Sequence, residues 1–275
     1  MTKRLDVVII GAGIAGLTAA YSLQKHGFAV EVIEADSRIG GRMTSDSVDG
    51  YVIDRGAQFL SSAYPVISNL IAEMGLQVEF IKTSPWAAIR RNGEIHKFRY
   101  DDVFSPVKSR LLTWNEWFRF GMGSLKHARA LVGLPVNDYS AWTEFDTRTA
   151  TSWYNAQYGE WMTEYLIEPL LEGFYFQSPE GTSRALPMAV SGFLARGAQT
   201  MTLKGGIGTL TSVLADRLRV SLSERAEKIS VGQNQVKVQT MKREIESDFV
   251  ICAVPAHIAK QIGAGESPLL NTPYA

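Results

Sequence analysis

Cysteine and histidine are scarce in this sequence, and their scarcity excludes several classes of protein. The single cysteine among 275 residues, Cys252, rules out an internal disulfide framework. It lies in the apolar run 249–254, which favours buried packing over a catalytic role. With only four histidines, no spacing typical of a metal site is present. This composition fits a reducing compartment, most simply the cytoplasm.

An excess of charge of one sign is also missing. The 28 Lys and Arg residues equal the 28 Asp and Glu residues, so nothing indicates a nucleic-acid partner. Apolar residues make up 45% and charged residues 20%, as in ordinary soluble proteins of one large or two modest domains. The apolar stretch 7–23 contains three glycines and is at the short limit for a membrane span. Without a plausible cleavage site, it is also not typical of a signal peptide.

The stretch from Leu5 to Arg42 is the most informative part of the chain. It opens with the β-branched run Val7–Ile10, which is typical of a buried parallel strand. A helical segment, Leu17–His26, follows and is closed by a glycine. A second apolar strand, Ala29–Ile33, comes next. The order strand, helix, strand is that of a dinucleotide-binding unit.

Three glycines between the first strand and the helix have the G-x-G-x-x-G spacing, and each has a distinct task. Gly11 permits the tight turn, Gly13 lets backbone N–H groups approach a pyrophosphate, and Gly16 allows close helix–strand packing. The helix N-terminus, with Ile14 and Ala15 beside these glycines, would then hold the negative charges.

An acidic residue, Glu34, ends the second strand at the distance where a carboxylate can accept both hydroxyls of an adenosine ribose. Ala35 follows it and belongs to the same predicted site. A glycine motif alone is a weak signal, and a Gly-rich buried helix is the alternative. Because strands, helix and acid all fall in register, we predict a dinucleotide site.

The run Arg38-Ile39-Gly40-Gly41-Arg42, directly after this acid, resembles the flavin-dependent amine oxidase superfamily. That group includes protoporphyrinogen oxidases, monoamine and polyamine oxidases and phytoene desaturases. A glycine pair lets the backbone pass close to a cofactor, and Arg42 could neutralise its phosphates. For Arg42 taken alone, a solvated surface charge is the other reading.

Further segments carry the same resemblance. Gly56, Ala57 and Gln58 match the family's G-x-x-x-D-x-G-A-Q/H segment, which leaves room beside the flavin ring. Ala226 matches the position whose backbone contacts the adenine in relatives. The run 204–210 is similar to the G-G-M-G-x-L motif that leads back into the flavin domain. The stretch 168–183 matches only moderately, so we assign it no role.

Between these segments, hydrophobic periodicity predicts the remaining elements. We expect a helix over 64–74, a strand over 78–81, a hairpin over 86–100 with its turn at Asn92-Gly93, and helices through the aromatic-rich stretch 104–173. A helix from 204 to about 218 and strands over 221–222, 226–231, 236–240, 244–246 and 249–253 should complete the chain. The aromatic residues could line an apolar substrate cavity, although each one taken singly fits a helix core better.

The resemblance implies an α/β fold: a Rossmann-like FAD-binding domain of the glutathione-reductase type with an inserted, mainly helical substrate domain. We place the FAD-binding domain at 1–80 and 204–275 and the insert at 81–203. The implied function is an FAD-dependent oxidoreductase that takes a hydride from a C–N or C–C bond of a largely apolar amine, tetrapyrrole or polyene. The sequence names no catalytic residue, and peripheral membrane contact stays open.

Two other functions remain possible from the sequence. Glu34 would serve the ribose of NAD equally well, which leaves an NAD-dependent dehydrogenase as an alternative. Relatives also continue beyond the position of Ala275 with a segment that binds the ribityl chain and ring of the flavin. We therefore expect a C-terminally truncated chain, which alone would bind FAD weakly and show no turnover, as a non-catalytic FAD-binding fragment.

Overall fold

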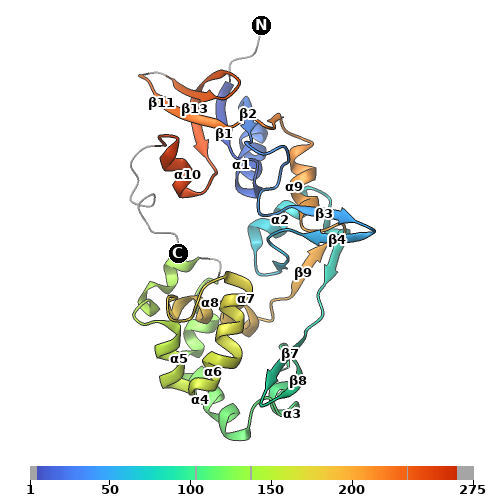
Figure 1. Cartoon of the computed structure of the whole chain (residues 1–275), viewed down its shortest axis with the longest axis vertical. Coiled ribbons are helices and arrows are strands. Elements are labelled where there is room, and N and C mark those ends of the chain that lie inside the picture. Colours follow the sequence, from blue (N-terminus) through green and yellow to red (C-terminus); the bar gives the residue numbers. More distant parts are fainter. Residues whose placement is uncertain (1–4, 103, 137, 234, 265–275) are drawn as a thin grey trace. The chain divides into compact units, whose positions relative to one another are not determined.

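The computed structural model describes residues 5–102, 104–136, 138–233 and 235–264, and they form two compact units (Figure 1). The described part of the first unit comprises 5–60, 66–81 and 201–264. The second comprises Ser61–Pro65 and Lys82–Thr200, so its main stretch interrupts the first unit in sequence. The sequence placed these boundaries at 80/81 and 203/204, and it did not foresee that Ser61–Pro65 groups with the second unit.

A six-stranded sheet, in the order β10-β2-β1-β13-β12-β11, forms the centre of the first unit. Its four strands β10, β2, β1 and β13 run parallel, and β12 and β11 extend it antiparallel. The bounds are β1 Leu5–Ile10, β2 Val30–Ile33, β10 Val220–Ser221, β11 Ala226–Val231, β12 Val236–Thr240 and β13 Glu244–Cys252. This parallel centre confirms the α/β prediction and gives the sheet a row of carboxyl ends at one edge.

Strand β1 separates two hydrophobic cores because its side chains alternate between the faces of the sheet. Val7 and Ile9 pack with α1, α2 and α9, whereas Val8 and Ile10 pack with the antiparallel strands and Ile262. The helices of this unit are α1 Ile14–Lys25, α2 Pro65–Glu73, α9 Gly208–Ala215 and α10 Ala256–Gln261, with a 3₁₀ turn at Gln77–Glu79. Since both faces are covered, β1 is apolar throughout its second half, as in other parallel strands.

Two smaller sheets complete the connections. Strands β3 Ser45–Val48 and β4 Tyr51–Asp54 form a hairpin. Strands β5 Leu60–Ser61, β9 Thr200–Leu203 and β6 Phe80–Lys82 form a three-stranded sheet in the order β5-β9-β6. The chain leaves the first unit and returns to it within the three-stranded sheet, whereas the hairpin belongs to the first unit.

The second unit is mainly helical. It opens with a hairpin, β7 Trp86–Arg91 and β8 Glu94–Arg99, whose turn residues Asn92 and Gly93 have φ of 53° and 83°. This geometry confirms the predicted Asn-Gly turn. The helices are α3 Ser105–Lys108, α4 Trp114–Gly133, α5 Ala150–Tyr158, α6 Glu160–Met162, α7 Glu168–Tyr175 and α8 Ala185–Ala195, with a 3₁₀ segment Tyr139–Phe145 and a π turn Thr163–Ile167.

Many of the predicted aromatic residues form the core of this unit. Trp142 is fully buried, and Trp153, Tyr154, Tyr158 and Trp161 are each less than a tenth exposed. Others point outward: Trp114 and Phe118 on α4 are 69% and 60% exposed. The prediction that each aromatic residue packs in a helix core is therefore confirmed for the buried residues and wrong for Trp114 and Phe118.

Several predicted bounds differ from the structure for identifiable reasons. The helix expected at Leu17 begins at Ile14, because Gly13 is its N-cap in an extended conformation. The strands expected at 244–246 and 249–253 are one strand, β13, since it pairs with β12 at one end and with β1 along the other. Cys252 within it is partly buried, whereas Phe249 in the same run is 62% exposed.

Two further elements are shorter or shifted. The strand expected over 78–81 begins at Phe80, after the 3₁₀ turn, and the helix expected to reach 218 ends at Ala215. The sequence analysis also missed β3, β5, β9 and α10. Among the residues that the structure describes, no helix combines the length and the apolar character needed to cross a membrane.

Two glycines on α4 provide a matched test of helix packing. A Cβ on Gly123 would lie 2.2 Å from Cε1 of Tyr158, whereas one on Gly121 would meet no atom within 4 Å. We predict that Gly123→Ala lowers the unfolding free energy of the helical unit by about 1–3 kcal/mol through overpacking. Gly121→Ala should instead be neutral or stabilising by up to about 1 kcal/mol, because alanine favours the helix. Urea unfolding of both variants measures the difference; equal stabilities would contradict this packing.

Candidate cofactor-binding site

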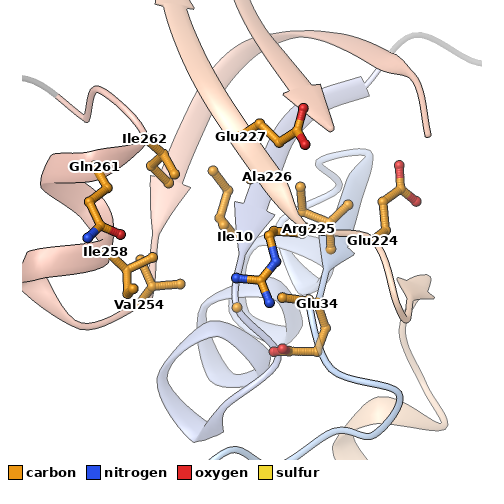
Figure 2. A pocket seen from close by; sticks show the side chains of 13 residues that line it. Ile10, Glu34, Glu224, Arg225, Ala226, Glu227, Val254, Ile258, Gln261 and Ile262 are labelled. Atoms are coloured by element: carbon orange, nitrogen blue, oxygen red, sulfur yellow. The ribbon is translucent and has the colours of Figure 1, made fainter. Parts of the chain in front are cut away.

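A pocket of about 370 Å³ lies where strands β1 and β2 of the central sheet end and β11 begins (Figure 2). Strand ends, the start of β11 and α10 contribute its lining: Ile10, Gly11, Ile33, Glu34, Ala35, Glu224, Arg225, Ala226, Glu227, Val254, Ile258, Gln261 and Ile262. Ligands of open α/β sheets bind outside the carboxyl ends of the strands, so this is the expected position for a nucleotide.

The three motif glycines differ sharply in their surroundings. Gly11 has φ of +106°, and a Cβ there would lie 2.8 Å from the carbonyl oxygen of Ala253. A Cβ on Gly16 would lie 1.9 Å from the carbonyl oxygen of Gly11. The fold itself therefore requires both of these glycines. Gly13 has φ of −75°, and a Cβ there would meet nothing within 4 Å, so packing within the described residues does not require a glycine at this position.

The N-terminus of α1 is suited to an anion. Its cap, Gly13, offers no side-chain hydrogen bond, and no acidic residue lies in the first turn. The N–H groups of Ile14, Ala15 and Gly16 have no acceptor within the helix, because the first intrahelical bond is donated by Leu17 to Gly13 at 3.0 Å. Free N–H groups and the helix dipole together favour a phosphate at this position.

The Glu34 carboxylate is held in a fixed orientation. Its Oε2 accepts the N–H of Ala12 at 2.7 Å, and its Oε1 accepts the N–H of Asp36 at 2.9 Å. The backbone N–H of Glu34 donates to the carbonyl oxygen of Ser221 at 2.9 Å. Each carboxylate oxygen keeps a second acceptor position. The group is therefore ready to accept two hydroxyls, as the ribose assignment requires.

The Gly-Gly-Arg segment lies beside Gly13. Gly40 donates its N–H to the carbonyl oxygen of Ala12 at 2.8 Å and forms a parallel bridge with Gly13. A Cβ on Gly41 would lie 3.4 Å from Cα of Gly13. The Arg42 side chain is exposed and has no hydrogen bond or ion pair within the described part of the chain. A cation is thus available near the helix N-terminus.

The third predicted segment, residues 56–58, contacts the backbone of Arg42. A Cβ on Gly56 would lie 2.4 Å from the carbonyl oxygen of Arg42, and that oxygen accepts the N–H of Ala57 at 2.9 Å. Gln58 is exposed and does not line the pocket. Of the predicted site residues, Gly11, Glu34, Ala35 and Ala226 line the pocket itself, whereas the start of α1 and the segments around Arg42 and Gly56 do not. Their roles as cofactor ligands stay predictions.

Sequence reasoning missed an ion-pair cluster behind one wall of the pocket. Arg243, before β13, donates through Nη2 to the fully buried Glu31 at 2.5 Å and through Nε to Glu224 at 2.8 Å. The hydrogen bond from Arg243 holds the pKa of Glu224 below its usual value. Glu224 in turn donates its N–H to the carbonyl oxygen of Glu34 at 2.7 Å. The only local signal was Glu31, a charge inside an apolar strand.

The fold and the pocket define a dinucleotide-binding protein with a Rossmann-like centre. The sequence profile of the family described as flavin containing amine oxidoreductase matches residues 14–273. The chain belongs to this family. Its cofactor is therefore FAD rather than NAD.

Individual relatives agree with this assignment. The chain is 26% identical over 279 residues to flavin-containing amine oxidase A of Canis lupus familiaris, covering 94% of this chain and 51% of the relative. It is 28% identical over 179 residues to protoporphyrinogen oxidase 2 of Arabidopsis thaliana, covering 64% and 34%. A solved putrescine oxidase bound to putrescine has the same fold, with a TM-score of 0.71, 23% identity, and coverage of 94% and 60%.

These coverages also show that the chain matches only part of each relative. The chain spans about half the length of the mammalian amine oxidase and a third of the plant protoporphyrinogen oxidase. The residues present fit the adenosine and pyrophosphate half of FAD, through the carboxylate of Glu34, the open space at Gly13 and the helix N-terminus.

The contrast between Gly13 and Gly16 can be tested directly. We predict that Gly13→Val keeps a native far-ultraviolet circular dichroism spectrum but purifies without bound flavin, because the new side chain fills the space a pyrophosphate needs. Gly16→Val, by contrast, should fail to fold, because its Cβ collides with backbone. Visible absorbance of the purified variants reports flavin content. A Gly13→Val variant with a full complement of flavin would refute the ligand role.

Glu34 provides a second test, of affinity. Replacing Glu34 with Ala removes the acceptor for the ribose hydroxyls and should weaken FAD binding by about 1–3 kcal/mol, roughly 5- to 150-fold. Glu73→Ala is the matched control, because this exposed glutamate pairs with Lys25 away from the pocket. Fluorescence titration with FAD measures both variants. Unchanged affinity in Glu34→Ala would contradict the ribose assignment.

Proposed function

We propose that the whole protein oxidises a largely apolar small molecule, with FAD accepting a hydride from a C–N or C–C bond. The observation that carries this proposal is the fit of the pocket and glycine turn to the cofactor, joined to family membership. FAD, once bound, supplies the redox chemistry, and the chain positions it.

Different residues of the first unit bind different parts of the cofactor. The first-turn N–H groups of α1 and the free guanidinium of Arg42 neutralise the pyrophosphate. Glu34 accepts the ribose hydroxyls, and the apolar walls of the pocket remove the adenine from water. Because the carboxylate and the helix are fixed by backbone contacts before binding, little ordering has to accompany cofactor uptake.

For the substrate, we propose an amine, a tetrapyrrole or a polyene. The names of the relatives support these three classes: amine oxidases, a protoporphyrinogen oxidase and, at 28% identity over 285 residues, a phytoene desaturase of Arabidopsis thaliana. We assign substrate binding to the helical unit. Its exposed aromatic side chains, such as Phe174 and Phe176 at 61% and 89% exposure, offer apolar contact area.

A second candidate function is cofactor binding without catalysis. The chain spans about half of the amine oxidases that it matches, and the described residues form one half of a cofactor site. A protein with only this half would bind the adenosine part of FAD and leave the ring without a dry, shaped site for hydride transfer.

Anaerobic flavin reduction distinguishes these functions. The natural full-length protein, loaded with FAD, is mixed with representative amines, protoporphyrinogen and phytoene, and the visible flavin band is followed. We expect bleaching of the flavin band with one of these substrate classes. If the flavin is stoichiometrically bound in the full-length protein and no class reduces it, the oxidoreductase proposal is wrong and the binding function stands.

A further inference from the structure

The pocket lining includes a cation that has no partner among the described residues. Arg225 lies at the start of β11, between Glu224 and Ala226, and lines the pocket. Its side chain is exposed and makes no hydrogen bond or ion pair with any residue that the structure describes. Figure 2 shows its guanidinium extending into the pocket on the side of Glu34. The nearby acid Glu224, by contrast, is paired with Arg243.

The backbone that carries Arg225 is firmly placed, although the tip of its side chain is free. The carbonyl oxygen of Arg225 accepts the N–H of Met241 at 3.1 Å. The preceding residue, Glu224, is held by Arg243 and by its own N–H bond to Glu34. The guanidinium is thus delivered to the pocket from a rigid strand start, as a ligand-contacting group requires.

The chemistry on the other side of the pocket is apolar. Val254, Ile258 and Ile262 line it from the segment after β13 and from α10, and Figure 2 shows Val254 and Ile258 across from Arg225. A slot with aliphatic side chains on one side and a planar, weakly hydrated cation on the other suits a flat aromatic ring. The Glu34 carboxylate at the slot's edge suits hydroxyl groups rather than a phosphate, because it would repel an anion.

We propose that Arg225 is an adenine-recognition residue: its guanidinium plane covers one face of the adenine of FAD, while the aliphatic side chains cover the other. This assignment concerns cofactor binding and stands whether or not the protein catalyses oxidation. Arg225 would add affinity for the base, as Glu34 does for the ribose. It also explains why an unpaired cation is placed beside a nucleotide pocket.

Three substitutions at this position separate stacking from charge. We expect Arg225→Gln to weaken FAD binding by about 2- to 30-fold, the range of a desolvated cation–π contact. Arg225→Lys should recover only part of that loss, because an ammonium group keeps the charge over the ring but has no plane to stack. Arg225→Tyr should bind within about 2-fold of the natural protein, because its ring restores a planar cover. Lys228→Gln is the matched control, since Lys228 is exposed on the same strand outside the pocket.

The measurements are fluorescence titration with FAD and calorimetric titration with ADP, which carries the adenine, ribose and diphosphate but not the flavin, both on the flavin-free protein. Loss in Arg225→Gln should be equal for the two ligands, with an unchanged melting temperature of the flavin-free protein. Equal affinities in Arg225→Gln and Lys228→Gln would show that Arg225 is only a surface charge. Full affinity in Arg225→Lys together with loss in Arg225→Tyr would show that it pairs with a carboxylate or phosphate, and would overturn stacking.

Discussion

The contact between Gly16 and the carbonyl oxygen of Gly11 is the constraint on which the cofactor site depends. No side chain fits between them, because even a Cβ would lie 1.9 Å from that oxygen. The first turn of α1 therefore packs directly on the turn that ends β1. This packing places the free N–H groups of the helix beside the carboxyl ends of the parallel strands, and the adjoining Ala12 N–H then fixes the Glu34 carboxylate.

The opposite wall of the pocket depends on a second constraint, which is electrostatic. Arg243 joins the buried Glu31 of β2 to Glu224 at the start of β11, across 212 residues of sequence for the longer pair. Removing one member of such a cluster leaves a buried charge unpaired, which is costly, so the cluster fixes the position of its neighbours. The backbone at Ala226 and the base of Arg225 are thereby set before any ligand binds. Packing on one side and ion pairs on the other make the site preorganised.

Sequence reasoning succeeded where the physics is local. Spacing alone predicted the glycine turn, the position of Glu34 at the end of β2 and the Asn92-Gly93 hairpin, because turn geometry and strand ends are decided within a few residues. It also gave the bounds of β11 as they are in the structure. It failed where distant pairings decide. Nothing near Glu31 names Arg243 as its partner, and the continuity of β13 follows from pairing with two different strands. Burial of individual aromatic residues was likewise undecidable, because each depends on packing across helices.

The structure also separates residues that the sequence treats alike. The three glycines of the motif differ in why a glycine is present. Packing requires Gly11 and Gly16, whereas nothing in the described chain restricts the side chain at Gly13. A glycine that packing does not require, next to free helix N–H groups, favours a bound anion at this position. The same reasoning applies to charge. Arg243 has partners within the fold, and Arg225 in the same wall has none among the described residues. On the proposal made here, the ligand supplies the missing partner, and Gly13 and Arg225 together delimit the adenosine and pyrophosphate half of the cofactor site.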